Sequence, residues 1–564
     1  PIFMPLQKNQ VLTLQVERLS SDGSGVAHSP EGETVFIPGA APGDEARVRI
    51  VKDCKRYAFG ILDEVLKPSP DRIPVDCAVA GPCGGCSLRH LDYAAELRAK
   101  QENVADAFAR IGGLDVPVLP IVGSPEIDRY RNKVQFPVGT DKAGRPCIGF
   151  YAGRTHRIVP CPDCRLQPGV LNEIGNTLCA FFAEKGIHPY NEETGKGLVR
   201  HIFLRRGAHS GQIMVCLVST RAKLPSAEEL CTRLKEAFPD IVTILLNVNA
   251  KNTNVILGSE THTLYGQGYI EDTLCGVPVQ LGPLSFYQVN TLAAEQLYGI
   301  AAEYAQLTPD DLLLDLYCGM GTIGLSMADH CRELVGVEIV PEAIESAKAN
   351  AARMGAAVSA KSRFFCADAG QAAAQLAAEG LHPDVVMLDP PRKGCDEATL
   401  SAVVRMAPRR VVYVSCNPAT AARDAAWLEQ NGYHAEKVQP VDLFPRTKHV
   451  ETVVLLSHKK ADSYIHIDVE FGEGEGKIPV DSIAKRAEAY KPKEKVTYKM
   501  IKEYIEAKYG FKVHTAYIAE VKRNLGLPMY DAPNAVEELK QPRKHPTPEK
   551  IEAIKDALRY FAVI

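Results

Sequence analysis

The sequence predicts an α/β protein whose main domain is a doubly wound parallel sheet and whose N-terminal part is a small β-barrel. Residues 1–66 contain five short alternating runs separated by Gly, Pro and Asp turns, a pattern typical of an OB-type barrel. From about Leu292 to Leu456, apolar strands alternate with Ala-rich helices, which predicts a sheet covered by helices on both faces. All 16 cysteines lie between Cys54 and Cys416, so the C-terminal part differs in composition from the rest.

Five segments follow one another along the chain. We expect the barrel over 1–66, a loop-rich cysteine segment with one helix over 67–117, an α+β insertion with a second sheet over 118–285, the doubly wound domain over 286–458, and a basic helical extension over 459–564.

The composition is that of a folded chain. Of 564 residues, 46% are hydrophobic and 24% are charged, which excludes a disulfide-stapled peptide and a disordered chain. No apolar run reaches the roughly 18 residues that cross a bilayer, and the first ten residues lack the core of a signal peptide. We therefore expect a cytoplasmic monomer without a membrane partner. The net charge of -4 means that a nucleic-acid site, if present, must be local.

Strand ends in the doubly wound region carry residues suited to a nucleoside cofactor. The run LLLDLYCGMGTIGL places Gly319 and Gly321 after an apolar strand, where small residues let the backbone approach a ligand. The next two strands end at Glu338, which can bind ribose hydroxyls, and at Asp368, which can accept from an adenine amino group. These features suit NAD as well as S-adenosylmethionine. The turn DPPRKG at Asp389 favours the second, because a rigid Pro-Pro turn can face a planar base beside the cofactor.

The fifth strand and the segment after it carry a nucleophile and a base. Cys416, in VYVSCNP, ends a strand at the ligand crevice, and the Asn-Pro that follows turns the chain away and can expose the thiol. The alternative is a buried structural cysteine. His449 and Glu451 precede another apolar strand in KHVETVVLL, where Glu451 is either a base or a solvated strand-edge carboxylate.

Together, DLYCGMGTIGL, GVEIVPEAI, LDPPRKG, VYVSCNP and PVDLFPRTKHVETV resemble the RNA uridine-5-methyltransferase family of the RumA/TrmA type. The resemblance implies a Rossmann-like methyltransferase domain in which Cys416 adds to carbon 6 of uracil, Glu451 removes the carbon 5 proton and Asp389 positions the ring. It also implies S-adenosylmethionine as the methyl donor. Thr322 stands where some relatives carry Asn. From the strand ends and the resemblance together, the predicted cofactor contacts are Gln288, Tyr317, Gly319, Gly321, Thr322, Glu338, Asp368 and Asp389.

The cysteine segment indicates a metal site. Cys77, Cys83 and Cys86 are spaced C-x5-C-x2-C, and Cys161 and Cys164 recur in VPCPDCRL. Four thiolates hold zinc or an iron-sulfur cluster, and spacing alone does not choose between them. The run from CGGC to Tyr93 resembles the branch of the family that carries a [4Fe-4S] cluster. That resemblance implies a folding or RNA-positioning cluster with the ligands Cys77, Cys83, Cys86 and Cys164.

RNA is the partner that the resemblance implies. The barrel is similar to a TRAM domain, an RNA-binding OB-like module, and DRYRNKVQF is similar to a segment that lines the family's RNA groove. Between Lys485 and Arg523 lie 11 basic and five acidic residues, which suit an RNA-binding helix-turn-helix, a solvated face or a partner-docking element equally. The candidate phosphate contacts are Arg47, Arg49, Lys52, Lys55, Arg56, Arg129, Arg131 and Lys133.

The sequence thus predicts an enzyme that methylates carbon 5 of a specific uridine in RNA. We expect 23S ribosomal RNA, because the barrel and the cysteine segment resemble that branch, with transfer RNA as the alternative. An exocyclic-amine methyltransferase would not need Cys416 or Glu451. A non-catalytic iron-sulfur RNA-binding protein would not keep the cofactor, nucleophile and base motifs together.

Overall fold

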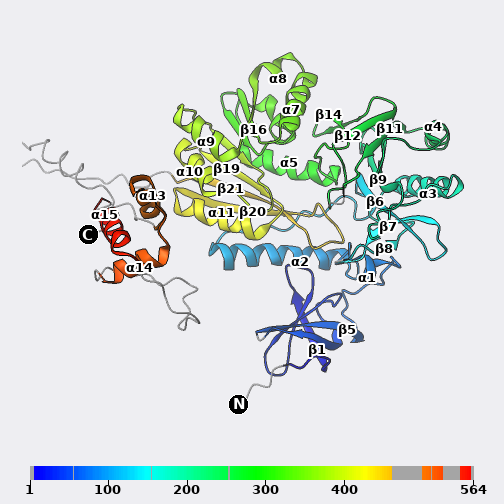
Figure 1. The fold of residues 1–564 in the computed structure, drawn as a ribbon, viewed down its shortest axis with the longest axis horizontal. Helices are drawn as coiled ribbons and strands as arrows, with labels where there is room; N and C mark the ends of the chain where they lie inside the picture. Colours follow the sequence, from blue (N-terminus) through cyan, green and yellow to red (C-terminus); the bar gives the residue numbers. More distant parts are fainter. Residues whose placement is uncertain are drawn as a thin grey trace, which may run out of the picture. The chain divides into compact units, whose positions relative to one another are not determined.

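The computed structural model describes residues 6–54, 56–153, 155–251, 254–459, 498–509, 511–524 and 546–560. The chain forms two compact units, Pro1–Tyr464 and Ile465–Ile564. The first unit contains a closed barrel, two seven-stranded sheets and a two-stranded hairpin (Figure 1). The predicted α/β class, with an N-terminal barrel and a doubly wound domain, is confirmed.

The barrel closes five strands in the order β1-β2-β3-β5-β4. Alternate residues point inward, and Val35, Val48 and Ala58 are completely buried in its centre. Strands β3 and β5 pair in parallel although they are not consecutive, with Phe36 opposite Phe59. The strands are β1 (Val11–Leu19), β2 (Gly25–His28), β3 (Thr34–Ile37), β4 (Glu45–Asp53) and β5 (Tyr57–Lys67).

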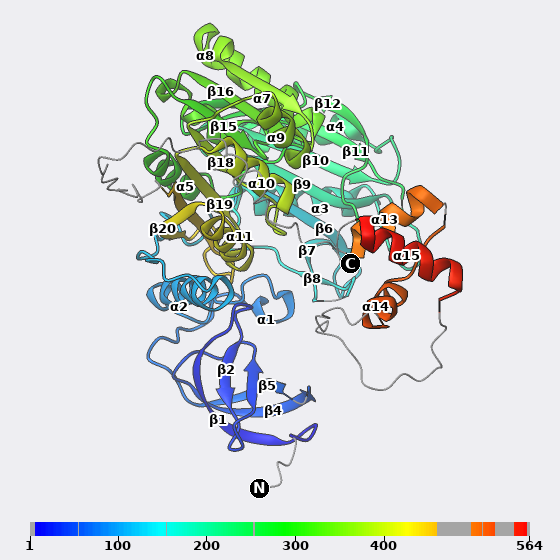
Figure 2. The same ribbon diagram turned by 90° about the vertical axis from the view of Figure 1, so that its left-hand side faces the viewer.

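Helix α2 connects the barrel to the rest of the unit. After the short α1 (Ala80–Cys83), α2 (Tyr93–Asp106) begins where the Asp92 side chain accepts a hydrogen bond from the Ala95 N–H, and it continues as the π-helix η1 (Ala107–Gly112). Figures 1 and 2 show α2 between the barrel and the doubly wound sheet. This helix is therefore placed to hold both.

The central insertion contains the second sheet, in the order β12-β11-β10-β9-β6-β7-β8. The strands are β6 (Lys133–Thr140), β7 (Pro146–Tyr151), β8 (Ile158–Pro160), β9 (Val199–Arg206), β10 (Ile213–Ser219), β11 (Ile241–Val248) and β12 (Glu260–Tyr265), with the helices α3 (Gly169–Glu184) and α4 (Ala227–Ala237). The hairpin β13 (Ile270–Leu274) and β14 (Val277–Leu281) follows it.

The doubly wound sheet has the order β17-β16-β15-β18-β19-β21-β20. Its first five strands are parallel and β21 runs antiparallel beside β19. The strands are β15 (Leu312–Leu316), β16 (Glu333–Glu338), β17 (Ser362–Cys366), β18 (Val385–Leu388), β19 (Arg410–Ser415), β20 (Tyr433–Val441) and β21 (Glu451–His458). Its helices are α5 (Thr291–Ala305), α6 (Thr322–Ser326), η2 (Ala328–His330), α7 (Pro341–Met354), α8 (Ala356–Lys361), α9 (Ala369–Ala378), α10 (Glu397–Met406) and α11 (Pro418–Gln430).

The second unit is helical where it is described, as predicted. Helices α13 (Tyr498–Tyr509), α14 (Thr515–Asn524) and α15 (Pro548–Tyr560) share an apolar core that includes Ile505, Ile518 and Ile554. Residues 460–497 and 525–545, over which the predicted extension also runs, lie outside the described residues. Across the ranges that the structure describes, no helix is long and apolar enough to cross a membrane.

Candidate active site

The predicted nucleophile and base lie at one edge of the doubly wound sheet. Parallel strands present their carboxyl ends at the same edge, so Tyr317, Asp389 and Cys416, which follow β15, β18 and β19, gather there. Strand β21 runs the other way, and its pairing sets Thr452 opposite Ser415. Glu451, the first residue of β21, therefore lies beside Cys416.

A short hydrogen-bonded turn holds the Cys416 backbone. The Asn417 N–H donates to Ser415 Oγ at 3.0 Å, and Asn417 Oδ1 accepts from the Ala419 N–H at 3.2 Å as the cap of α11. Asn417 Nδ2 also donates to the Arg392 carbonyl at 3.0 Å, which ties the turn after Asp389 to the nucleophile. The thiol is half-buried, in contrast to a packed structural cysteine.

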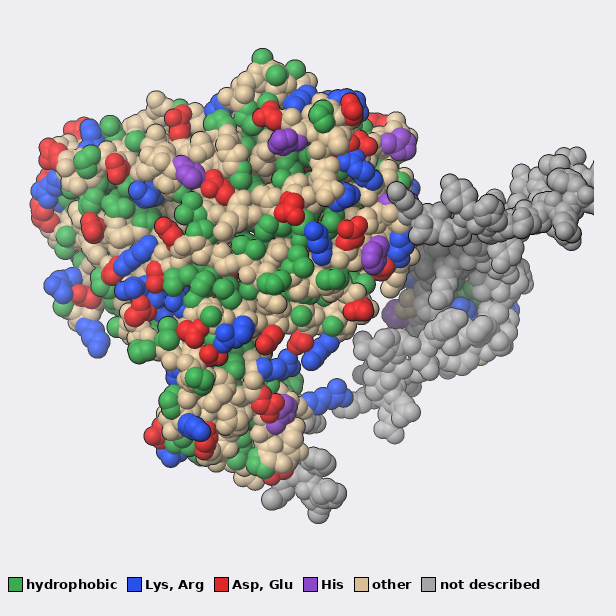
Figure 3. Space-filling model, turned by 180° about the vertical axis from the view of Figure 1, so that it is seen from behind, with side chains coloured by type: hydrophobic (Ala, Val, Ile, Leu, Met, Phe, Trp, Pro, Cys, Tyr) green, Lys and Arg blue, Asp and Glu red, His purple; other side chains and the backbone are tan. Residues whose placement is uncertain are grey.

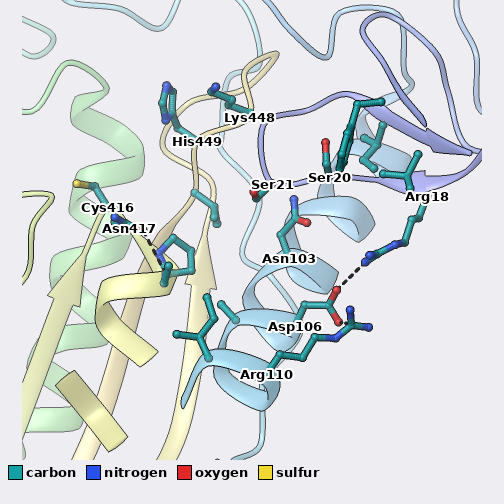
Figure 4. Close-up of a pocket in the computed structure, with 18 of the residues that line it drawn as sticks. Arg18, Ser20, Ser21, Asn103, Asp106, Arg110, Cys416, Asn417, Lys448 and His449 are labelled. Carbon is teal, nitrogen blue, oxygen red and sulfur yellow. Dashed lines mark hydrogen bonds and ion pairs between the residues drawn. The ribbon is translucent and has the colours of Figure 1, made fainter. Parts of the chain in front are cut away.

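Cys416 lines a cavity of about 520 Å³. Figure 4 shows its side chains arriving from three parts of the chain: the loop and strands around Cys416 and His449, helix α2 with Asn103, and the barrel with Arg18. Arg18 pairs with Asp106 at 2.7 Å and so links the barrel to α2. The cavity is large enough for a nucleotide-sized ligand, and Cys416 forms part of its wall.

Buried carboxyl groups dominate the electrostatics of this edge. Glu451 is 5% exposed, and burial together with Asp389 raises its pKa to about 8. Burial raises the pKa of Asp389 to about 7. Burial, Glu451 and Asp389 also raise the pKa of the Cys416 thiol, while Arg392 acts in the opposite direction. Near neutral pH Glu451 and Asp389 can therefore exchange protons, which is what acid-base chemistry requires.

The glycine-rich turn after β15 is shaped for a ligand. Tyr317 has a φ of 64°, and Gly321 has a φ of 78° with an added Cβ only 3.2 Å from Ala347, so the turn is tight. Glu338 receives the Gly319 N–H at 3.1 Å and the Ile339 N–H at 2.8 Å. The predicted cofactor carboxylate is thus fixed at the carboxyl end of β16.

Apolar side chains beside Glu338 suit an adenine ring. Ile339, Val340 and Phe365 are 62%, 46% and 39% exposed, although they lie next to the ends of β16 and β17. Asp368 caps α9 by accepting from the Gln371 N–H at 3.1 Å. This combination of exposed apolar groups and acceptors fits the adenosine part of S-adenosylmethionine.

Two further predicted cofactor residues lie in or beside buried hydrogen-bonded elements. The carbonyl of Gln288 accepts from Asn132 Nδ2 at 2.7 Å, in the loop before α5. Thr322 Oγ1 lies 3.1 Å from the hydroxyl of Tyr298. Asn132 lies in the DRYRNKVQF segment, but its contact with Gln288, which joins two domains, was not predicted.

Sequence reasoning also missed a buried charge network that holds the loop before Glu451. Lys100 is 1% exposed and donates to Glu96 at 2.8 Å, to Asp442 at 2.7 Å and to the Phe444 carbonyl at 3.1 Å. The Tyr93 hydroxyl donates to Asp442 at 2.8 Å. The helical spacing of Glu96 and Lys100 was the only local signal.

The predicted cluster thiols share one neighbourhood. Cys83 and Cys86 each lie close enough to Cys77 and Cys164 for the charges of these thiolates to raise their pKa. A hydrogen bond from Cys161 and backbone N–H groups lower the pKa of Cys164 to about 6, despite its burial. Among the described residues, however, no group of three or more His, Cys, Asp or Glu side chains has the spacing to hold a metal ion.

Several predicted phosphate contacts are engaged within the protein. Arg47 pairs with Glu64 at 2.6 Å, and Arg49 pairs with Asp63 at 2.8 Å. Arg129 pairs with Asp163 at 2.6 Å and donates to the Cys164 carbonyl at 2.9 Å, so it braces the cysteine loop.

The other predicted phosphate contacts differ in exposure. Lys52 and Arg56 are exposed, while Arg131 and Lys133 are partly buried. Burial and the neighbouring cations Arg205 and Arg131 lower the pKa of Lys133 to about 8. Lys55 lies outside the described residues. On the face shown in Figure 3, basic and acidic side chains are interspersed, in line with the near-neutral net charge.

Comparison with known proteins gives consistent matches. Residues 280–459 match the tRNA (uracil-5-)-methyltransferase family, and residues 5–62 match the TRAM domain. An uncharacterized RNA methyltransferase of Halalkalibacterium halodurans is 43% identical over 456 residues, 81% of this chain and 98% of that protein. One of Clostridium tetani is 41% identical over 455 residues, with 81% and 98% covered.

A solved structure is similar as well. The Pyrococcus abyssi tRNA (uracil-54, C5)-methyltransferase in complex with S-adenosyl-L-homocysteine is 27% identical with a TM-score of 0.63, covering 79% of this chain and 100% of that one.

Proposed function

Because the chain belongs to the RumA/TrmA-type RNA (uracil-5-)-methyltransferase family, we propose that it methylates carbon 5 of one uridine in ribosomal RNA, with Cys416 as the nucleophile and Glu451 as the base. The observation that supports this best is the shared sheet edge, where Glu451 and Asp389 both act on the pKa of Cys416, a residue that also lines the cavity. The family membership makes the chain an S-adenosylmethionine-dependent RNA methyltransferase.

The reaction explains why these residue types meet. Carbon 5 of uracil is a poor nucleophile, so the Cys416 thiolate adds to carbon 6 and converts the ring into an enolate. Burial and the two acids raise the pKa of Cys416, and the nearby Arg392 cation opposes that rise, so Arg392 favours the thiolate form that this step needs. Asp389 holds the uracil edge by hydrogen bonding.

Bound S-adenosylmethionine supplies the methyl group that carbon 5 takes up. Glu338, Asp368 and the exposed apolar side chains beside them would hold its adenosine, and Gln288, Tyr317, Gly319, Gly321 and Thr322 would complete the site.

Glu451 then takes the proton from carbon 5, and the bond between Cys416 and carbon 6 breaks as the ring double bond re-forms. A base works best when its pKa lies near the operating pH, and the raised pKa of Glu451, about 8, meets that condition. Burial also keeps bulk water from competing for the proton.

Ribosomal RNA is proposed because a TRAM domain and a cysteine segment accompany the catalytic domain. Transfer RNA is the second candidate, and one observation favours it: the similar Pyrococcus abyssi enzyme is a transfer RNA uracil-54 methyltransferase. Incubating the purified protein with labelled S-adenosylmethionine and unmodified ribosomal or transfer RNA separates them. Label in 5-methyluridine of 23S RNA is expected, and label confined to transfer RNA would reverse the assignment.

We also propose that Cys77, Cys83, Cys86 and Cys164 hold a [4Fe-4S] cluster. Cys83 and Cys86 each interact electrostatically with Cys77 and Cys164, which supports this set. The four thiols would have to move closer together to bind one cluster, because no described group has the spacing of metal ligands. A cluster held by four thiolates would brace the cysteine loop instead of reacting. After anaerobic purification we expect about four irons and four sulfides per chain. Bound zinc without sulfide would contradict the cluster.

A further inference from the structure

Three aromatic rings form a platform on the outer wall of the barrel. The ring centroids of Phe36, Tyr57 and Phe59 lie 5.6 to 5.9 Å apart. Strands β3 and β5 pair so that Phe36 lies opposite Phe59 and Thr34 opposite Tyr57. Val35 and Ala58, the alternating neighbours, are completely buried in the barrel core, so the three rings point outward.

The rings form an apolar surface that retains contact with solvent. Tyr57 is 40% exposed, and Phe36 and Phe59 are partly exposed. The side chain of Tyr57 meets both neighbours edge-on, at 77° and 87°, while the two Phe rings tilt by only 37°. Pairs of outward aromatic rings on a small barrel are a common surface for stacking planar groups.

The platform is continuous with the cavity of the nucleophile. Thr34 and Phe36 line the same cavity as Cys416 and Lys448. Phe59 and Tyr57 extend the surface from Phe36 along β5. An RNA strand that enters this cavity therefore meets the Phe36 ring as well as the residue of the nucleophile.

Positive charge borders the platform. Lys52 lies directly opposite Phe59 in the pairing of β4 with β5, so its side chain stands on the same face as that ring. Arg56 precedes Tyr57 in the chain, and both cations are exposed. Aromatic rings beside exposed cations are the combination that binds unpaired nucleic acid: bases stack on the rings and phosphates meet the charges.

We propose that Phe36, Tyr57 and Phe59 form a stacking site for an unpaired nucleobase next to the target uridine, with Lys52 and Arg56 contacting the adjoining phosphates. The proposal rests on the proposed function, since it takes RNA as the substrate. It specifies that the RNA is single-stranded on one side of the uridine, because a paired base cannot offer its face to the platform. Stacking of this kind tolerates any base and contributes affinity instead of sequence choice.

The test is RNA binding by fluorescence anisotropy. The probe is a labelled, unmodified single-stranded oligonucleotide that contains the uridine identified as the target in the methylation assay. Tyr57→Ala and Phe59→Ala are each expected to weaken binding by about 5- to 100-fold. Tyr57→Phe keeps the ring and should bind like the wild type. Leu66→Ala is the matched control, because Leu66 lies on the same strand and is also 40% exposed.

A second RNA, with abasic sites on either side of the uridine, identifies the stacking itself. On this RNA the Tyr57→Ala variant should bind as well as the wild type, since neither can stack. Equal binding of the wild type and Tyr57→Ala to the intact RNA would overturn the proposal, as would an equal loss on both RNAs, which would indicate a folding effect or an apolar protein partner for the surface.

The methylation assay separates this proposal from the proposed function. Tyr57→Ala should raise the KM for RNA and leave kcat within about twofold. If the wild type does not methylate uridine at all, the proposed function fails. If the wild type methylates but Tyr57→Ala has an unchanged KM, only the platform fails.

Discussion

Two buried carboxylates in this protein behave in opposite ways. Asp44 in the barrel is completely buried, yet hydrogen bonds from Arg72 and from the N–H groups of Ser69 and Ala41 outweigh burial and lower its pKa. Glu451 at the sheet edge is almost as buried, but Arg392 only partly offsets burial and Asp389, and its pKa rises to about 8. Asp44 therefore stabilises the fold in its charged form. For Glu451 the charged form is costly to bury, so this carboxylate can take up a proton near neutral pH.

The partners explain the difference. Arg72 reaches Asp44 from the segment after the barrel and joins the two parts, and each carboxylate oxygen has a donor. At the sheet edge the neighbours of Glu451 include a second acid, Asp389, and the buried Asp315 of β15 has a pKa raised to about 8 by burial and Asp389. Asp44, whose charge is balanced by Arg72, therefore connects the barrel to the next segment. The buried acids at the sheet edge lack such a balance, and they lie at the candidate active site.

The largest expected effect is the loss of methylation when Cys416, which lies beside Glu451 and Asp389, is replaced. Cys416→Ala should abolish methylation, because it removes the thiol that is proposed to add to carbon 6 of uracil. The measurement is transfer of labelled methyl groups to RNA. Cys147→Ser, which changes another half-buried thiol away from this edge, should retain activity. Full methylation by Cys416→Ala would rule out the covalent mechanism.

The next largest effect is expected when the ion pair between Arg72 and Asp44 is removed. Arg72→Met leaves Asp44 buried without its cation and should lower the free energy of unfolding of the barrel region by about 3 kcal/mol. Urea unfolding followed by intrinsic fluorescence measures it. Lys348→Met, which removes an exposed pair with Glu345, should change stability by less than about 0.5 kcal/mol. Equal effects of the two changes would contradict the assigned difference.

A pH series tests the uncompensated acid. Because the pKa of Glu451 is raised from 4.5 to about 8, the folded state holds a proton that the unfolded state loses over this window. Glu451 therefore makes stability fall as the pH rises from about 4.5 to about 8. The Asp44 contribution has the opposite sign, since its lowered pKa gives stability that is lost as the pH falls. The measurement is the midpoint of urea unfolding at a series of pH values. In Glu451→Gln this midpoint should fall less steeply between about pH 4.5 and about pH 8 than in the wild type, and an equal fall in both would contradict the raised pKa.

The smallest effect concerns the cofactor side. Thr322→Val removes the hydroxyl that lies 3.1 Å from Tyr298 and should raise the KM for S-adenosylmethionine by about two- to tenfold, with kcat nearly unchanged. Steady-state methylation at saturating RNA measures it. Thr308→Val, at a turn outside the site, is the control.

The strand-end residues were predictable because each lies in one continuous motif. Gly319 and Gly321 follow an apolar strand, and Cys416 lies before Asn-Pro, so local pattern was enough to place them at one sheet edge. The contacts that tune the edge were not predictable. Lys100 and Asp442 meet from distant parts of the chain, and whether a carboxylate finds a cation depends on such long-range packing.

The barrel shows the same limit. Its alternating strands were readable, but the platform depends on β3 pairing with β5, which are not consecutive. Arg47, Arg49 and Arg129 looked alike in the sequence as cations for RNA, yet each has an acidic partner in the fold. The charge of a residue in the sequence therefore did not show whether its side chain is available to RNA or is already paired with an acid of the protein.

The central claim is that Glu451 is the base that releases a covalent Cys416–uracil intermediate. The direct measurement is denaturing electrophoresis of Glu451→Gln after incubation with S-adenosylmethionine and the RNA substrate. We expect a protein–RNA band that resists denaturation, carries the methyl label and disappears when Cys416→Ala is added to the same chain. Normal turnover by Glu451→Gln, or no adduct together with intact RNA binding, would contradict it.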